Sequence, residues 1–287
     1  MPSDQRLRIA YQGTAGAYSH RACTQVFPDA EFLACPDFHT ALDLVVQGAA
    51  DHAMIPLENS TAGRVEEIYR LIPRTPLFIT AEHFEPVNHC LLGVAGATLD
   101  SITRVRSHPQ ALAQCHHRLV NFGIRAEAAV DTAQAAADLV AEADPTLGAI
   151  ASSLAAELYG LDIIQEQFQD VTGNTTRFVI FSREASHSVA QDSTRYLTSV
   201  LFSVRNIPAA LYKALGGFAT NGVNMVKLES YMDGGTMEAS HFHLDIHGHT
   251  EDPAVASALE ELKYFSRELR VLGVYPAHRY REHAAFV

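Results

Sequence analysis

The sequence is short of basic residues: 21 Lys and Arg stand against 33 Asp and Glu, a formal net charge of −12 with histidine neutral. A surface of this sign repels phosphate backbones and anionic headgroups, which excludes nucleic acids and membrane surfaces as general partners. No apolar run approaches the ~18 residues that a transmembrane helix needs, and the first residues contain no apolar signal region. We therefore expect a cytoplasmic protein.

Cysteine is also scarce, and no pair has the spacing of a redox or zinc motif. The four cysteines lie far apart in the chain and are Cys23, Cys35, Cys90 and Cys115. This pattern is typical of small, reduced core residues. The loop Gly13-x-x-Gly16 lacks the third glycine of dinucleotide-binding loops and the lysine of phosphate-binding loops. We therefore expect no cofactor.

Residues 241–249 resemble a metal site more than any other segment, because four histidines and Asp245 alternate with apolar residues. A strand places alternate side chains on opposite faces, so the polar residues share one face and Phe242, Leu244 and Ile246 share the other. A half-buried strand with a polar outer face needs this alternation in any case. We interpret the segment in that way and expect no metal.

From Leu7 to about Ala185 the chain alternates short apolar strands with helices. Each expected strand is followed by small polar residues and a helix, and the strands cover residues 7–11, 53–57, 102–106, 126–130 and 148–151. One of these helices is expected to begin at Pro109 and to stop at Gly123. The alternation predicts a mostly parallel α/β sheet. In such sheets ligands bind beyond the carboxyl ends of the strands, so these polar loops favour a cleft for an anion.

A second pattern follows a polar linker at residues 182–193. The expected elements are strand 196–204, helix 208–220, strand 223–232, a hairpin at Gly234-Gly235, strand 237–247, helix 253–269 and strand 271–275. This βαββαβ order predicts a separate ferredoxin-like domain.

Polar residues stand directly before an apolar strand in the segment Asp170–Ser182. Asn174, Thr176 and Arg177 precede the strand Phe178–Phe181. They form either an ordinary turn or a set of hydrogen-bond donors that the strand holds at a fixed depth.

Two further strand ends leave the same choice open. Ser107 and His108 either cap the helix that begins at Pro109 or bind a carboxylate. Glu58 is either a surface acid or a residue that orients neighbouring donors.

Five motifs, taken in order, resemble those of prephenate dehydratases with a C-terminal ACT regulatory domain. They are Gly13-x-x-Gly16-Ala17-Tyr18-Ser19, Pro56-Leu57-Glu58-Asn59-Ser60-x-x-Gly63, Ser107-His108-Pro109-Gln110-Ala111-Leu112, Thr132-Ala133-x-Ala135-Ala136 and Asn174-x-Thr176-Arg177-Phe178. In the second domain, the stretches that resemble effector motifs are Pro208-Ala209-Ala210-Leu211 and Leu228-Glu229-Ser230. Two positions depart from the family pattern: Ala17 replaces a common threonine, and Tyr231-Met232 replace an Arg-Pro pair.

The resemblance, which runs from about Leu7 to Tyr275, implies two domains. Residues 7–185 would form a two-lobed catalytic domain similar to type II periplasmic binding proteins, with crossovers near 80–90 and 165–172. Residues 194–279 would form the ferredoxin-like ACT domain, through which subunits associate as a homodimer or homotetramer. No chorismate mutase segment is visible before Leu7, so we expect a monofunctional enzyme.

The same resemblance implies the site residues. Thr176 and Glu58 are the expected catalytic residues. The expected substrate-binding residues are Gly16, Ser19, Asn59, Ser60, Gly63, Ser107, His108, Gln110, Thr132, Asn174, Arg177 and Phe178. The expected effector contacts are Pro208, Ala209, Ala210, Leu211, Asn224, Leu228, Glu229 and Ser230.

The implied function is conversion of prephenate to phenylpyruvate in L-phenylalanine biosynthesis, with feedback by L-phenylalanine and without metal or cofactor. An arogenate dehydratase, or an enzyme that accepts both substrates, is the nearest alternative, because the motifs do not separate an amino from a keto group. Alternatives from other classes are a solute-binding protein and a non-catalytic amino-acid sensor. The missing signal region opposes the first, and the intact motif at 174–178 opposes the second.

Overall fold

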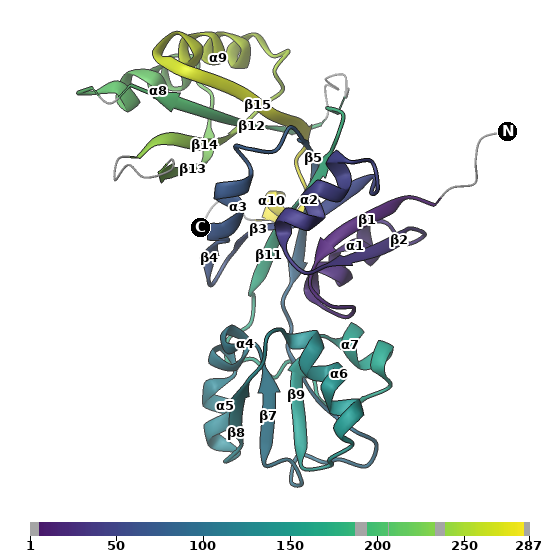
Figure 1. Cartoon of the computed structure of the whole chain (residues 1–287). Coiled ribbons are helices and arrows are strands. Elements are labelled where there is room, and N and C mark those ends of the chain that lie inside the picture. The colour runs from purple at the N-terminus through teal and green to yellow at the C-terminus, as the bar shows by residue number, and fades with distance from the viewer. Residues whose placement is uncertain (1–5, 187–193, 206, 233–238, 284–287) are drawn as a thin grey trace, which may run out of the picture. The chain divides into compact units, whose positions relative to one another are not determined.

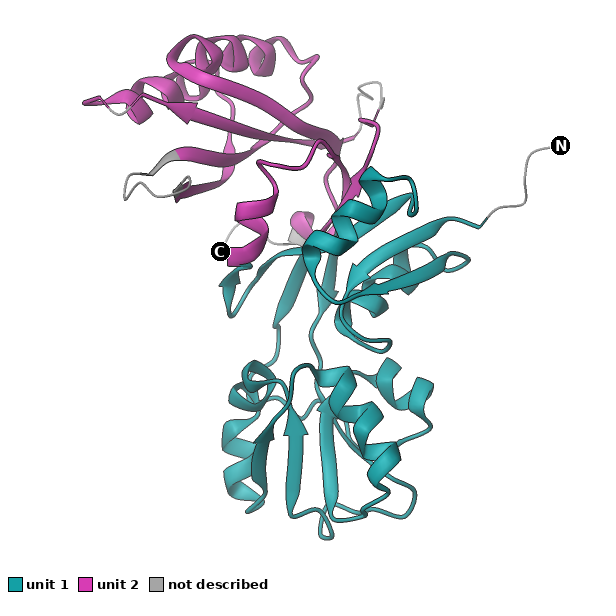
Figure 2. Cartoon of the chain, viewed as in Figure 1, with its two compact units in different colours: residues 1–65, 83–178 teal, residues 66–82, 179–287 magenta. Residues whose placement is uncertain are grey.

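The computed structural model describes residues 6–186, 194–205, 207–232 and 239–283. The chain forms two compact units, which are shown in Figure 2. The first unit contains residues 1–65 and 83–178, and the second contains residues 66–82 and 179–287. The strands β5 (Phe78–Pro86) and β11 (Thr175–Ser182) each begin in one unit and end in the other.

The first sheet has the order β2-β1-β3-β11-β5, with β4 paired to β3. Its parallel strands are β1 (Arg8–Gln12), β2 (Glu31–Cys35) and β3 (His52–Asn59). The short strand β4 (Gly63–Arg64) runs antiparallel to the end of β3. The helices α1 (Tyr18–Val26) and α2 (Phe38–Val46) follow β1 and β2, and the side chain of Asp37 caps α2 by accepting from the Thr40 N–H.

The second sheet of the same unit has the order β10-β6-β9-β7-β8. Figure 1 labels its strands β7, β8 and β9. Its strands are β6 (Cys90–Gly93), β7 (Arg104–Ser107), β8 (Arg125–Ala128), β9 (Leu147–Ala151) and β10 (Asp162–Gln165). Its helices are α4 (Pro109–Gln114), α5 (His116–Asn121), α6 (Thr132–Glu142) and α7 (Ser153–Tyr159). The chain passes between the two sheets at residues 87–89 and again at 166–174.

Two details of this unit differ from the sequence-based expectation. The second sheet is mixed rather than mostly parallel, because β6 runs antiparallel to both β9 and β10. The helix expected from Pro109 to Gly123 is divided at Cys115. The cause of the division is a residue distant in the sequence. The carboxylate of Asp170 accepts from the backbone N–H groups of His117 and Arg118 and so caps a new helix, α5.

The second unit contains the predicted βαββαβ order. Its elements are β12 (Tyr196–Val204), α8 (Ala210–Thr220), β13 (Met225–Met232), β14 (Ala239–His247), α9 (Pro253–Phe265) and β15 (Ser266–Pro276), together with α3 (Glu66–Leu71) and α10 (Tyr280–His283). The antiparallel sheet has the order β13-β14-β12-β15. The last strand starts earlier than expected, because Ser266 already pairs with Val204. The expected hairpin at Gly234-Gly235 lies outside the described residues.

The polar face expected on the histidine-rich strand β14 is exposed only in part: His247 is exposed, but the middle of the face is buried. His243 and Asp245 are both 0% exposed. Asp245 accepts a hydrogen bond from Ser199, and Tyr69 of α3 lies 5.8 Å from the ring of His243. Residues distant in the sequence therefore cover the face that the alternation alone assigns to solvent. Within the described ranges, no cluster of three or more His, Cys, Asp or Glu side chains could hold a metal ion.

None of the helices in the described part of the chain has both the length and the apolar character needed to cross a membrane.

Candidate active site

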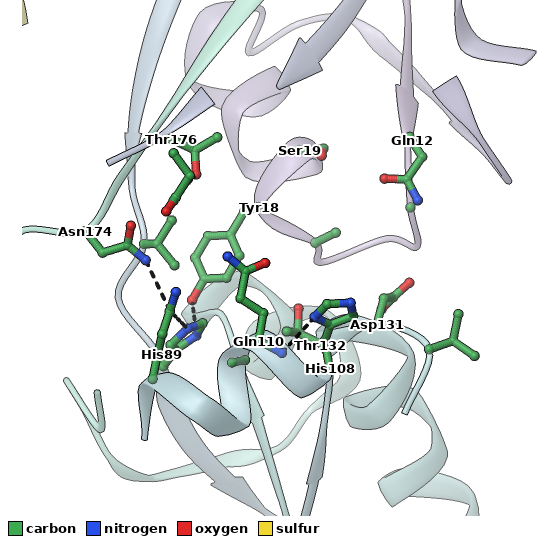
Figure 3. A pocket seen from close by; sticks show the side chains of 17 residues that line it. Gln12, Tyr18, Ser19, His89, His108, Gln110, Asp131, Thr132, Asn174 and Thr176 are labelled. Atoms are coloured by element: carbon green, nitrogen blue, oxygen red, sulfur yellow. Dashed lines mark hydrogen bonds between the residues drawn. The ribbon is translucent and has the colours of Figure 1, made fainter. Parts of the chain in front are cut away.

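A cavity of about 280 Å³ lies within the first unit, and Figure 3 shows the side chains around it. Its lining residues come from the ends of β1 and β3, the start of β11, the starts of α1 and α6, both ends of α4, and the two segments that connect the sheets. They are Gln12, Gly13, Ala17, Tyr18, Ser19, Asn59, Val87, His89, His108, Gln110, Ala111, Gln114, Val130, Asp131, Thr132, Asn174 and Thr176. Three helix N-termini therefore reach this cavity, and the positive ends of their dipoles favour a negatively charged ligand.

Thr176 presents a hydrogen-bond donor to the cavity because of its contact with Asn59. The Oδ1 atom of Asn59 accepts from the backbone N–H groups of Thr61 and Ala62 at 3.0 and 2.9 Å, which fixes the orientation of the amide. The Nδ2 atom of Asn59 then donates to Oγ1 of Thr176 at 2.9 Å. Since the threonine oxygen already accepts, its own hydrogen is available to a ligand.

The glycine loop before α1 is held in place by contacts with α1 and with the start of α7. The N–H of Gly16 donates to Nδ1 of His20 at 3.0 Å, and its carbonyl accepts from Ser152 at 2.6 Å. A Cβ atom at Gly16 would lie only 2.9 Å from the Cα atom of Ala155, and φ is +92°. Gly16 itself does not line the cavity, but it places Ala17, Tyr18 and Ser19 there.

Glu58 and Arg177 contact each other through an ion pair in which Arg177 is buried and Glu58 is partly exposed. Nη1 of Arg177 donates to Oε1 of Glu58 at 2.9 Å, and the side chain of Arg177 is 2% exposed. Neither residue lines the cavity. Phe178, the next residue on β11, is buried at 1% exposure. The pair therefore joins the end of β3 to β11 beside Thr176.

Seven of the predicted catalytic and substrate-binding residues line the cavity: Ser19, Asn59, His108, Gln110, Thr132, Asn174 and Thr176. His108 also caps α4, because its Nδ1 atom accepts from the N–H of Gln110. Ser107 is 0% exposed, and its hydroxyl donates to the carbonyl of Ile150 at 2.6 Å. Ser60 accepts from the N–H of Thr175, and Gly63 lies on β4.

Sequence reasoning assigned no role to several polar residues that line the cavity, namely Gln12, His89, Gln114 and Asp131. Asp131 could have been found, because it immediately precedes the Thr132 motif and caps α6 through the N–H of Gln134. His89 and Gln114 carry no local signal, since only the fold brings them together, with a separation of 2.8 Å between Nε2 and Oε1.

The predicted effector residues lie on two elements of the second unit. Pro208 and Ala209 precede α8, Ala210 and Leu211 begin it, and Ala209 has the positive φ of 63° that glycine adopts more easily. Leu228, Glu229 and Ser230 lie on the edge strand β13. Asn224 immediately precedes β13, with its Nδ2 atom 3.3 Å from Nδ1 of His247.

Comparison with known proteins supports a single family. A family model described as prephenate dehydratase matches residues 9–186. The chain is 46% identical to a bifunctional N-acyl-homoserine lactone acylase/prephenate dehydratase from Komagataeibacter europaeus, over 95% of this chain and 97% of the relative. It is 39% identical to arogenate dehydratase/prephenate dehydratase 1 of Arabidopsis thaliana, over 95% of this chain and 73% of the relative. A crystal structure of prephenate dehydratase from Arthrobacter aurescens in complex with L-Phe superposes with a TM-score of 0.85 at 30% identity and covers 97% of both chains.

Proposed function

Because this chain belongs to the prephenate dehydratase family, we propose that it catalyses the decarboxylative dehydration of prephenate to phenylpyruvate. The observation that carries this proposal is the hydroxyl of Thr176, which accepts from Asn59 and keeps its hydrogen for a ligand in an anion-favouring cavity. The fold that we propose for the catalytic part is the two-lobed arrangement of type II periplasmic binding proteins, and for residues 194–279 an ACT domain.

The loss of CO2 and water from prephenate is strongly favourable because it forms an aromatic ring, so the protein needs to supply little chemical assistance. The ring hydroxyl of prephenate must leave as the carboxylate is lost. A threonine hydroxyl is a weak acid, so Thr176 acts by donating a hydrogen bond that strengthens as negative charge develops on the departing oxygen. The rest of the site holds the two carboxylates and excludes water.

We assign carboxylate binding to residues whose donors face the cavity. These are Ser19, His108, Gln110, Thr132 and Asn174, together with the helix N-termini. Arg177 and Glu58 support the site from outside the cavity, since their ion pair joins β11 to β3 next to the contact between Asn59 and Thr176.

Substrate preference is tested by offering prephenate and arogenate in parallel to the purified full chain and measuring phenylpyruvate and phenylalanine. We expect turnover of prephenate, with arogenate turned over more slowly or not at all. A preference for arogenate would establish the nearest alternative, which the names of the Arabidopsis relative make the leading rival. No turnover of either by a folded protein would leave a binding cleft and favour the sensor interpretation.

A second activity is named for the Komagataeibacter relative, an N-acyl-homoserine lactone acylase. Hydrolysis by a side-chain nucleophile would need a base beside it. In the described part of the chain, neither histidine of the cavity contacts a serine or threonine hydroxyl: His89 contacts Tyr18 and Gln114, and His108 caps α4. Burial also raises the pKa of the Cys115 thiol to about 12. The cavity therefore favours the dehydratase.

We also propose that L-phenylalanine inhibits the enzyme by binding to the second unit, near the start of α8 and β13. Support comes from the effector motifs there and from the L-Phe complex of the Arthrobacter protein. Saturating L-phenylalanine is expected to weaken prephenate binding by roughly 5- to 150-fold, the range of ordinary allosteric coupling, and so to lower the rate at low prephenate concentrations. D-Phenylalanine serves as the control ligand, and light scattering shows whether the subunits form the proposed homodimer or homotetramer. An L-phenylalanine titration that changes neither rate nor oligomer size contradicts the proposal.

A further inference from the structure

Four polar side chains form a hydrogen-bonded chain along one wall of the cavity (Figure 3). The phenol oxygen of Tyr18 lies 2.8 Å from the carbonyl oxygen of Asn88 and 2.9 Å from Nδ1 of His89. Nε2 of His89 lies 2.8 Å from Oε1 of Gln114, and Nδ2 of Asn174 lies 3.1 Å from the same Oε1. His89 is 2% exposed and Asn174 is 8% exposed, so these two side chains depend on their neighbours in the chain for hydrogen bonds.

The donor and acceptor roles along these hydrogen bonds follow from the contact between Tyr18 and the carbonyl of Asn88. A carbonyl oxygen only accepts, so the single hydrogen of the Tyr18 hydroxyl belongs to that bond. The Tyr18 oxygen must then accept from an N–H at Nδ1 of His89. A neutral imidazole carries hydrogen on one nitrogen only, so Nε2 is an acceptor and needs a donor from Gln114. An amide oxygen at that contact agrees only with a doubly protonated ring.

Burial favours the neutral ring. It lowers the pKa of His89, because the charged form loses its hydration, and the hydrogen bond to Gln114 opposes this only in part. The titratable groups that surround Tyr18, the partner of His89, are Arg21, Glu85, Cys90 and Cys115. Arg21 and Glu85 lie 3.2 Å apart and offset each other, and burial raises the pKa of both thiols. The remaining titratable groups of the cavity wall are His108 and Asp131.

A donor from Gln114 is obtained by turning two amides. Oxygen and nitrogen of an amide are similar in size, so a half turn of Gln114 and of Asn174 keeps every contact distance and exchanges donor with acceptor. Gln114 then donates to Nε2 of His89 and to the oxygen of Asn174. The position that Oδ1 of Asn174 now occupies is buried without a hydrogen-bond partner, so after the turn it holds Nδ2, whose N–H groups are left for a ligand. Figure 3 shows that this position points to the side of the cavity where Thr176 lies.

We propose that neutral His89 is a positioning residue of this site: acting through Gln114, it makes the Asn174 amide present its N–H groups to a carboxylate of the substrate. The identity of that carboxylate rests on the proposed function. Protonation of His89 exchanges the donor and acceptor roles of Gln114 and Asn174, since a ring with two N–H groups requires the oxygen of Gln114 as its acceptor. Asn174 then presents its oxygen to the carboxylate, so KM rises as the pH falls below the pKa of His89, and kcat/KM falls with it.

The kinetic test compares two variants of His89 over a pH series, with the nonenzymatic reaction subtracted. The wild-type kcat/KM is expected to fall by up to about tenfold per pH unit on the acid side, as for a single titrating group. His89→Gln keeps an acceptor near the position of Nε2 but does not titrate, so this acid limb should disappear while activity is retained. His89→Met offers only a weak thioether acceptor and should raise KM by about 10- to 100-fold, with a smaller change in kcat. His117→Gln, at an exposed position on α5, is the matched control and should keep the wild-type profile.

A second readout does not depend on turnover. In ¹⁵N-histidine spectra of the full chain, the signals that His89→Gln removes should be those of a neutral ring with its proton on Nδ1. A proton on Nε2, or a ring charged at neutral pH, would overturn the proposal, and so would an acid limb that persists in His89→Gln. If the Nδ1–H form is found but neither prephenate nor arogenate is turned over, the proposed function fails while the hydrogen-bond chain stands.

Discussion

Replacing Thr176 with valine should lower kcat by about 100- to 1,000-fold, the usual effect of removing one donor that stabilises a developing oxyanion. Valine keeps the branched shape of threonine on β11 and removes only the hydroxyl that Asn59 orients. Because we assign the two carboxylates to other residues, we expect KM to change by no more than a few-fold. Steady-state kinetics of phenylpyruvate formation measures both values.

Two neighbouring variants separate this effect from a structural one. Thr176→Ser keeps the hydroxyl and should retain activity within about tenfold of the wild type, since one lost methyl contact has a modest effect. Thr175→Val removes a hydroxyl whose contact is the carbonyl of Gly173 at 3.4 Å, on the opposite side of the strand, and should leave kcat unchanged. If Thr176→Val were nearly as active as the wild type, the assigned role of the hydroxyl would be wrong.

Replacing Gly16 with alanine should destabilise the first unit by roughly 2–5 kcal/mol, the sum of backbone strain and overpacking. The φ of +92° is unfavourable for any residue with a side chain, and the new Cβ would lie 2.9 Å from the Cα of Ala155. A backbone neighbour cannot move aside as a flexible side chain does. Relief of the clash would pull the loop away from Ser152 and His20 and displace Tyr18 and Ser19 from the cavity. Urea unfolding measures the loss.

Gly160→Ala is the matched control for the strain alone. Gly160 has a φ of +65°, and a Cβ atom there would meet nothing within 4 Å. Gly160→Ala should therefore lower the free energy of unfolding by only about 1–2 kcal/mol, as expected for a left-handed residue that gains a side chain. Equal losses in the two variants would show that the close approach of Gly16 to α7 has no energetic consequence.

Much of the site could be predicted from the sequence because its motifs lie at strand ends and helix starts. Thr176, Asn59 and His108 were assigned from the family resemblance of motifs at such positions, and all three line the cavity. Where a motif contained residues from both faces of a strand, we expected the residues of both faces to bind the ligand, although only one face can line the cavity. Alternation on β11 directs Thr176 to the cavity, while Arg177 is buried against Glu58, and on β7 Ser107 is buried against Ile150.

What the sequence could not predict depends on contacts between distant segments. Tyr18, His89 and Gln114 belong to three separate elements, and no spacing in the chain announces that their side chains meet. The buried face of β14 is a similar case, since Tyr69 of α3 precedes His243 by more than half of the chain. Periodicity predicts which residues share a face, but not what covers that face.

The most direct test of the account is a crystal structure of the full-length Thr176→Val variant with prephenate bound, because this variant should bind the dianion without converting it. We expect prephenate in the cavity of the first unit, with its ring hydroxyl beside residue 176 and a carboxylate within hydrogen-bonding distance of Asn174. Prephenate bound elsewhere, or bound there with its ring hydroxyl turned away from residue 176, would contradict the proposed mechanism.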